Sequence, residues 1–196
     1  MANTNNPFGL VPYRDSTGRP WTGGAKLYSV PASDGTALYP GDPVILAGSA
    51  DADGIPTVTI ATAAGGNYLL GAVVAVEPTM GAGANGRDST VYRAASTARY
   101  VWVADDPNTE FLIQEDAVGG ALAATDVGLN ADLISGSAST AYSQSGWQLD
   151  TSTKATTNTL QLKILGFAQK VGNEIGANAK VRVKINLHAL NNTTGY

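Results

Sequence analysis

The sequence contains no cysteine, which excludes disulfide bonds, thiolate zinc sites and cysteine nucleophiles from the chemistry of this protein. Charge is also scarce, because only 14% of the 196 residues are charged, against roughly 25% in an average soluble domain. The 12 basic residues are scattered singly among 16 acidic ones, so no basic stripe could follow a phosphate backbone. We therefore expect no nucleic-acid partner.

Long hydrophobic runs are missing as well. The longest, Leu69–Val76, falls far short of the ~20 apolar residues that a transmembrane helix needs. The first residues, MANTNNPFG, lack the basic and apolar regions of a signal peptide. We therefore expect no membrane partner, and a protein that is made and folded in a cytoplasm.

Motifs that could carry catalysis or bind a ligand are weak. Gly81–Gly86 matches the dinucleotide pattern G-x-G-x-x-G, but strand-like residues follow it where a helix is needed, which favours a flexible loop. Asp51–Gly54 resembles the start of a calcium loop, yet Ile55 and Pro56 occupy the next key positions, which favours an Asx turn. Another Ca²⁺ or Mg²⁺ site built from loop carboxylates stays open. His188, the single histidine, falls on the polar side of a strand, where we expect it to be exposed. We predict no catalytic residue, no cofactor and no metal site, and hence no enzyme.

Short apolar or alternating runs, separated by turn residues every 8–15 positions, predict an all-β protein. We expect one β-barrel or β-sandwich domain, with the choice between the two left open. Helix should be limited to one short turn within Ala117–Asp126, since two glycines interrupt that run. The expected strands are Lys26–Val30, Pro43–Leu46, Thr57–Thr62, Tyr68–Glu77, Thr90–Arg93, Arg99–Ala104, Glu110–Gln114, Ala131–Ile134, Trp147–Asp150, Thr159–Gln169 and Lys180–His188.

The first 24 residues differ from the rest, because recurring proline and glycine block both helix and central strand. Widely spaced apolar side chains nevertheless suit a segment that lies along another surface, its own or a neighbour's. We predict an extended N-terminal arm over 1–24, a β body over 25–189 and a tail over 190–196. The alternative is an N-terminal strand and loop that cover the chain's own core. The expected interface anchors of the arm, on a capsid or a sister subunit, are Phe8, Leu10, Tyr13 and Trp21.

The stretch RYVWVADDPNTEFLIQE, residues 99–115, gathers four carboxylates around one turn between two apolar runs. Asp-Asp-Pro-Asn is strong turn chemistry and fits a hairpin loop. We predict that Asp105 and Asp106 lie in the solvated hairpin tip, where no burial would tune them for acid–base catalysis.

The chain also resembles the capsid cement, or decoration, proteins of tailed bacteriophages. The resemblance is carried by NPFGLVP, PWTGG, YSVPASDGTALYPGDPVIL, DSTVYRAASTARYVWVADDPNTEFLIQED, DVGLNADLI and KVRVKINLH, between Asn6 and His188. It implies a non-enzymatic virion protein on the outer surface of an expanded capsid, made in the bacterial host cytoplasm. The implied partners are the major capsid protein, whose neighbouring subunits it would clamp against internal DNA pressure, and other copies of the chain in a homo-oligomer.

A second hypothesis is a glycan-binding β-sandwich of the head-fibre or adhesion type. In that case Trp102 and Trp147 would form a solvent-exposed platform for sugar rings.

Overall fold

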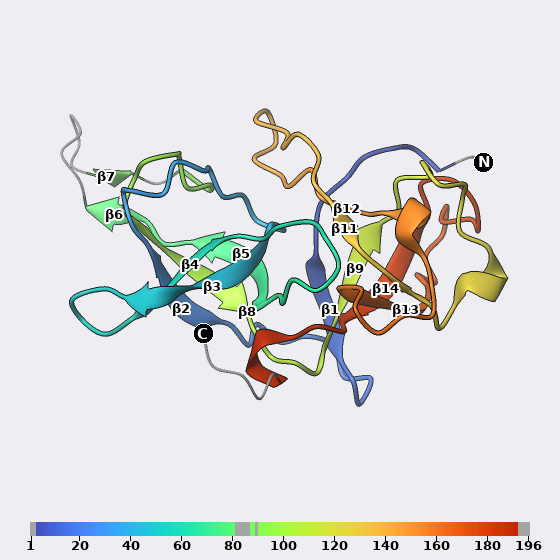
Figure 1. Ribbon diagram of the computed structural model, residues 1–196. Helices are drawn as coiled ribbons and strands as arrows, with labels where there is room; N and C mark the ends of the chain where they lie inside the picture. The colour runs from blue at the N-terminus through green and yellow to red at the C-terminus, as the bar shows by residue number, and fades with distance from the viewer. Residues whose placement is uncertain (1–2, 81–86, 89, 192–196) are drawn as a thin grey trace.

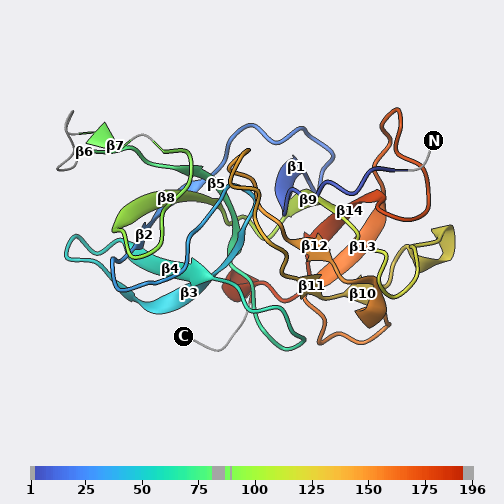
Figure 2. The same cartoon turned by 90° about the horizontal axis from the view of Figure 1, so that it is seen from above.

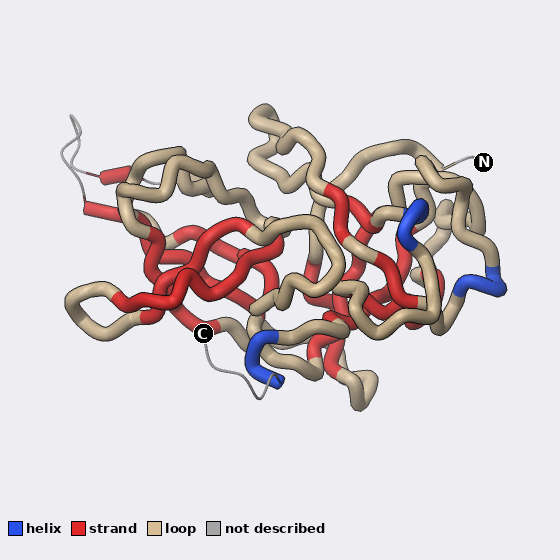
Figure 3. The backbone as a smooth tube through the Cα atoms, viewed as in Figure 1, coloured by secondary structure: helices blue, strands red, loops and turns tan. Residues whose placement is uncertain are grey.

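The computed structural model describes residues 3–80, 87–88 and 90–191 (Figure 1). Strands form nearly all of its regular structure (Figure 3). Helix in these ranges is limited to three 3-10 turns, η1 (Ala124–Asp126), η2 (Thr151–Thr153) and η3 (Ala189–Asn191). The predicted all-β class with very little helix is confirmed. Of the two architectures left open by the sequence, a closed barrel is formed, and a five-stranded sheet lies beside it.

The first body is the barrel, which Figure 2 shows end-on as a ring. A single parallel bridge between Ser29 and Thr57 closes the ring, and the other strand pairs are antiparallel. Valine side chains fill the interior, since β-branched residues pack well on a strongly curved sheet. The strands in order around the ring are β2 (Lys26–Val30), β4 (Pro56–Ile60), β3 (Pro43–Ala50), β5 (Gly71–Val76) and β8 (Arg99–Ala104).

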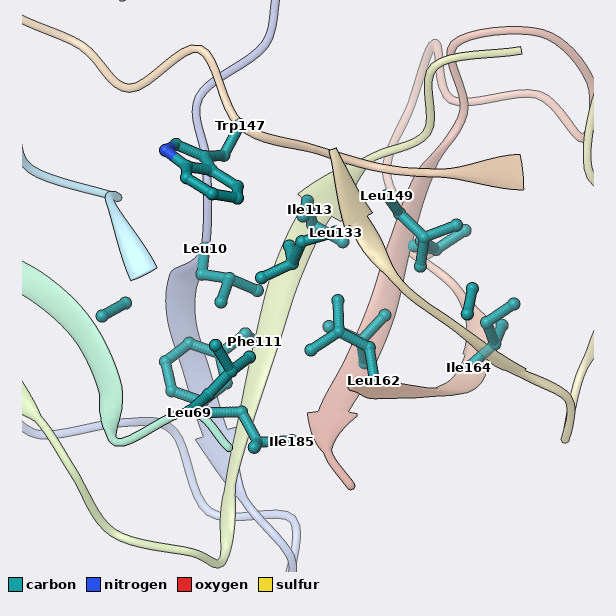
Figure 4. Packing of buried hydrophobic residues seen from close by; sticks show 14 of the residues in the cluster. Leu10, Leu69, Phe111, Ile113, Leu133, Trp147, Leu149, Leu162, Ile164 and Ile185 are labelled. Carbon is teal, nitrogen blue, oxygen red and sulfur yellow. The ribbon is translucent and has the colours of Figure 1, made fainter. Parts of the chain in front are cut away.

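The second body is an antiparallel sheet whose one face is covered by a short ribbon. Leu133 and Leu149 of the ribbon pack in one cluster with Ile113 and Leu162 of the sheet (Figure 4). The sheet order is β1 (Val11–Asp15), β9 (Thr109–Gln114), β14 (Lys180–Ile185), β13 (Leu162–Phe167) and β10 (Asn130–Ala131). The ribbon consists of β11 (Leu133–Ile134) and β12 (Gln148–Leu149), and a second ribbon of β6 (Thr79–Met80) and β7 (Arg87–Asp88).

The two bodies share one apolar core. Ala61, Leu69 and Ala72 from the barrel side belong to the same buried cluster as Phe111 of β9 and Leu10 of the N-terminal segment. Figure 4 shows the side chains of Leu10, Leu69 and Phe111 gathered where the bodies meet. We call this region the junction.

The predicted hairpin across Asp105–Asn108 is wrong. β8 pairs with β2 and β5 in the barrel, whereas β9 pairs with β1 and β14 in the sheet. Both edges of each strand are therefore occupied by other partners. The turn serves as the link from the barrel to the sheet.

The predicted strand Thr90–Arg93 is also not formed, apart from an isolated bridge between Leu38 and Arg93. The guanidinium of Arg93 is fully buried and donates to the carbonyls of Pro31, Asp34, Thr36 and Thr97. This segment holds loops together through a side chain, since a buried guanidinium must find acceptors for its five donors.

The N-terminal segment lies along the chain's own two bodies. Its residues 11–15 form edge strand β1, and Leu10 is fully buried. Gly9 has φ +71°, and a Cβ atom there would lie 2.1 Å from the Gly41 carbonyl oxygen. The Leu10 N–H donates to that same carbonyl at 2.8 Å, so the glycine permits a direct backbone contact. Of the predicted tail, residues 190 and 191 belong to η3 and the remainder lies outside the described residues.

Gly9→Ala should lower the free energy of unfolding by about 3 kcal/mol or more, because strain at positive φ adds to a backbone clash. Gly18→Ala is the matched control. Gly18 also has positive φ, +89°, but no atom lies within 4 Å of its Cβ position, so a loss of about 1 kcal/mol is expected. Urea unfolding of the three proteins measures both values. Equal losses would show that the close approach at Gly9 does not matter.

Candidate functional site

An apolar groove of about 470 Å³ opens at the junction, between the N-terminal segment, β5 and the loop around Tyr142. Among the described residues that line it, none is charged. Two side chains at its rim are strongly exposed, Val91 at 60% and Tyr142 at 80%. We call this surface the apolar groove, and its lining is Phe8, Leu10, Val11, Pro12, Trp21, Pro40, Gly41, Val73, Val74, Val91, Tyr142, Ser143 and Gln144.

The groove brings together three of the four anchors predicted from the sequence. Phe8 and Trp21 line it with half-buried side chains, whereas Leu10 lies at its base and is fully buried in the core. Tyr13 is outside the lining, and its ring lies 5.7 Å from the Arg14 guanidinium carbon. Leu10 therefore fastens the segment to its own body, while Phe8 and Trp21 remain available at a surface.

The sequence did not point to Val91 and Tyr142, which reach the groove from two segments far apart in the chain. Tyr142 lies outside every predicted strand, and Val91 lies within the predicted strand Thr90–Arg93. The one feature of the sequence that could have indicated Tyr142 is a large aromatic side chain in a loop of Ser, Gly and Ala. That feature indicates a binding surface only when the neighbouring residues are known, and the fold determines these neighbours.

A second hollow, of about 550 Å³, adjoins the groove, and Trp21 lines both. We call it the acidic pocket, since Asp15, Asp105 and Asp106 line it against one basic residue, Lys26. Asp106 is exposed as predicted, but it lies in the turn that links β8 to β9 and not at the tip of a hairpin. The full lining is Asp15, Pro20, Trp21, Thr22, Gly24, Ala25, Lys26, Asp105, Asp106, Pro107 and Thr109.

Asp105 corrects the prediction of a solvated tip, because it is only 3% exposed. Its Oδ2 accepts hydrogen bonds from the Tyr28 hydroxyl at 2.8 Å and from Lys26 Nζ at 2.9 Å. Burial, with the hydrogen bond to Asp105, raises the pKa of the Tyr28 hydroxyl. The carboxylate is buried because its turn runs between the two bodies instead of projecting from a hairpin.

His188 also differs from its prediction, since it is buried with 2% exposure. β14 ends at Ile185, so the strand alternation no longer holds at His188, which forms a parallel bridge with Leu69. Its Nδ1 accepts from the Leu190 N–H at 3.1 Å, and its Nε2 has no hydrogen-bond partner among the described residues. Burial lowers the pKa of His188 to about 4, although the negative charges of Asp105 and Asp106 oppose that shift.

A further cleft of about 690 Å³ separates the barrel from the loop before β12, and Asp42 and Trp147 are part of its lining. Asp42 accepts from the Tyr39 N–H at 2.8 Å and from the Ser145 side chain. Burial raises the pKa of Asp42 to about 6.

The tryptophan platform of the glycan-binding hypothesis is not formed as predicted. Trp147 is only 6% exposed and packs in the shared core (Figure 4). Trp102 lies on the outer side of β8, where its Nε1 donates to Glu77 at 2.6 Å.

The segment around Asp51 forms a turn and shows no calcium loop. Asp51 Oδ1 accepts from the N–H groups of Asp53 and Ile55 at 3.0 and 2.9 Å, so the predicted Asx turn is confirmed. Gly81–Gly86 lies outside the described residues. Over residues 3–80, 87–88 and 90–191 no group of three or more His, Asp or Glu is placed to hold a metal ion. In the same ranges no helix has the length and apolar character needed to cross a membrane.

Comparisons of the chain with protein-family models, with curated proteins and with solved structures found no match. The functional interpretation therefore depends on the chemistry of the described surface. The apolar groove and the acidic pocket are its two distinguishing features, and both lie at the junction.

His188 should make stability fall in acid. Its pKa is about 4 when folded and 6.5 as an unperturbed side chain, so its contribution is complete above pH 6.5 and is lost as the pH falls through 4. The loss amounts to up to about 3 kcal/mol. Urea unfolding at pH 7 and pH 4 gives the loss of unfolding free energy for wild type and for His188→Gln. The loss in wild type minus the loss in the variant is the contribution of His188. Parallel pH dependences would contradict the assignment.

Asp42 should act in the opposite direction. Its folded pKa of about 6 exceeds the unperturbed 3.8, so its contribution is complete below pH 3.8 and is lost as the pH rises through 6. Asp42→Asn keeps an acceptor for Tyr39 and provides a donor for Ser145. We therefore expect the variant to gain up to about 3 kcal/mol relative to wild type between pH 4 and pH 7, measured by the same unfolding curves. A constant difference would contradict this expectation.

Proposed function

We propose that the chain is a structural protein of a tailed-phage particle, which binds the outside of the expanded capsid and cements neighbouring major-capsid subunits. The single observation that carries this proposal is the apolar groove, in which no charged residue is present among the described lining residues. Cores of protein–protein interfaces are depleted in charge and enriched in aromatics, as this groove is with Phe8, Trp21 and Tyr142. The sequence resemblance to cement proteins points to the same role.

The wall of the groove is held in place before any partner binds. Asn3 Nδ2 donates to the carbonyls of Glu174 and Ala177 at 2.8 and 3.0 Å, and the Asn6 N–H donates to Gln114 Oε1 at 2.8 Å. The β1–β9 pairing also fastens Val11 and Pro12, which are part of the groove lining. A binding surface that is already ordered loses little conformational entropy on association, which supports a role in tight and lasting attachment.

The proposal assigns no catalytic activity to the chain. The groups with shifted pKa values have structural hydrogen bonds, as Glu115 illustrates. Burial raises the pKa of Glu115, whose oxygens accept from the N–H groups of Ala117 and Ala179 at 2.8 and 3.3 Å. These contacts fasten the end of β9 to neighbouring loops.

Sedimentation with expanded capsids that lack the protein tests the proposal. Wild type should bind them and raise the temperature at which they release DNA. Val91→Asp should bind at least tenfold more weakly, because it buries an unpaired charge in the interface. The control is Val171→Asp, the same change at a fully exposed valine outside the groove, which should bind as wild type does.

Failure of wild type to bind the capsids would remove the proposed function. Deleting residues 1–24 is a poorer test, because the deletion also removes β1 from the sheet and Leu10 from the core.

A further inference from the structure

The apolar groove and the acidic pocket lie at opposite ends of one strand. β1 contributes Val11 and Pro12 to the groove and Asp15 to the pocket, and the Trp21 side chain lines both. Figure 1 shows β1 in the middle of the molecule, between the barrel and the rest of the sheet. Val11 and Asp15 are four residues apart, which along a strand is about 13 Å.

We infer that the groove and the pocket form one docking site for an extended segment of a partner protein, in which an uncharged apolar stretch is followed about four residues later by lysine or arginine. The inference rests on the proposed function, because it describes the capsid segment that would be bound. The apolar stretch occupies the groove, and the basic side chain enters the acidic pocket.

The groove selects against charge in its occupant. A charged side chain placed among Phe8, Val74 and Val91 would lose water and find no ion partner among the described lining residues. Val11 and Pro12 of the extended strand β1 form part of the groove lining, which suits an occupant that is itself extended.

The pocket selects for a positive charge by complementarity. Its one ammonium, on Lys26, is already bound to Asp105 at 2.9 Å. Asp15 Oδ1 accepts from Thr17, and Asp106 Oδ1 accepts from the Asn108 N–H, while the Oδ2 atoms of both have no hydrogen bond among the described residues. The hydrogen bond from the Thr17 side chain lowers the pKa of Asp15, and the positive charge of Arg19 acts in the same direction.

Trp21 connects the two parts of the site. The faces of its indole are favourable both for apolar side chains and for a cation, since an ammonium or guanidinium is attracted to the ring quadrupole. A bound segment can thus place first an apolar and then a basic side chain against the Trp21 indole. The carboxylates beyond the ring provide the charge that fixes the direction of the segment.

Capsid binding by full-length variants tests the inference. Asp106→Lys should bind expanded capsids at least tenfold more weakly than wild type at low salt, and its binding should depend less on salt concentration. Asp53→Lys makes the same substitution at an exposed aspartate outside both hollows and should bind as wild type does. If wild type binds and Asp106→Lys binds equally well, the inference is wrong although the proposed function stands.

Calorimetric titration with two peptides separates the inference from the proposed function. Each peptide has eight residues, and its first six are Pro, Val or Leu. One peptide ends in two lysines and the other in two glutamates. Wild type should bind the lysine peptide at least tenfold more tightly, and Val91→Asp should abolish the difference. If wild type does not bind capsids but binds the lysine peptide more tightly than the glutamate peptide, the proposed function is wrong and the docking site is supported. If it binds neither capsids nor peptides, both the proposed function and the docking site are wrong.

Sedimentation equilibrium of the free protein addresses the other occupant, a second copy of the chain. A wild-type oligomer that Val91→Asp converts to monomers, with no discrimination between the peptides, would show that the groove binds a sister subunit and would overturn the inference. An unchanged oligomeric state together with peptide discrimination supports it.

Discussion

One backbone contact at the junction supports the rest of the molecule, where the N-terminal segment crosses the loop that leads into the barrel. Leu10 donates to the Gly41 carbonyl at 2.8 Å, and Gly9 donates to the Trp147 carbonyl at 3.2 Å. Neither glycine has room for a Cβ atom, which would meet a backbone oxygen at 2.1 or 2.2 Å. The contact brings the Leu10 side chain into the core that the barrel and the sheet share. Two small β bodies thereby bury one larger apolar interior, which stabilises them more than two separate cores would.

The same arrangement explains why polar groups are buried at the junction. β8 and β9 are neighbours in sequence but belong to different bodies, so the turn between them carries Asp105 into the interior. His188 is buried where the chain returns past Leu69 on the barrel side. Asp105 accepts hydrogen bonds from Tyr28 and Lys26, whereas the Nε2 atom of His188 has no hydrogen-bond partner among the described residues. Burial lowers the pKa of His188, because desolvation disfavours the charged form of an imidazole.

The proposed binding surface is a consequence of joining two rounded bodies. The segment that fastens them provides one wall of the apolar groove, so Leu10 packs inward while Phe8 and Trp21 line the surface. Under the proposed function rigidity and binding would be coupled, because a change that loosens the junction also loosens one wall of the groove. In the proposed role this coupling is useful, since a cement protein must resist force at the place where it is attached.

The sequence by itself determined the all-β class, the scarcity of helix and the bounds of strands such as β2 and β8, because alternation and turn residues act locally. It also singled out Phe8 and Trp21 as predicted interface anchors, and both line the groove, although their role at an interface stays a prediction. It could not determine strand partners, so the hairpin at Asp105 and the exposure of His188 were predicted wrongly. Pairing depends on which strand edges remain free after the barrel closes, and burial depends on what packs from elsewhere in the chain. Only the tertiary structure therefore decided which side chains meet at the junction and form the groove.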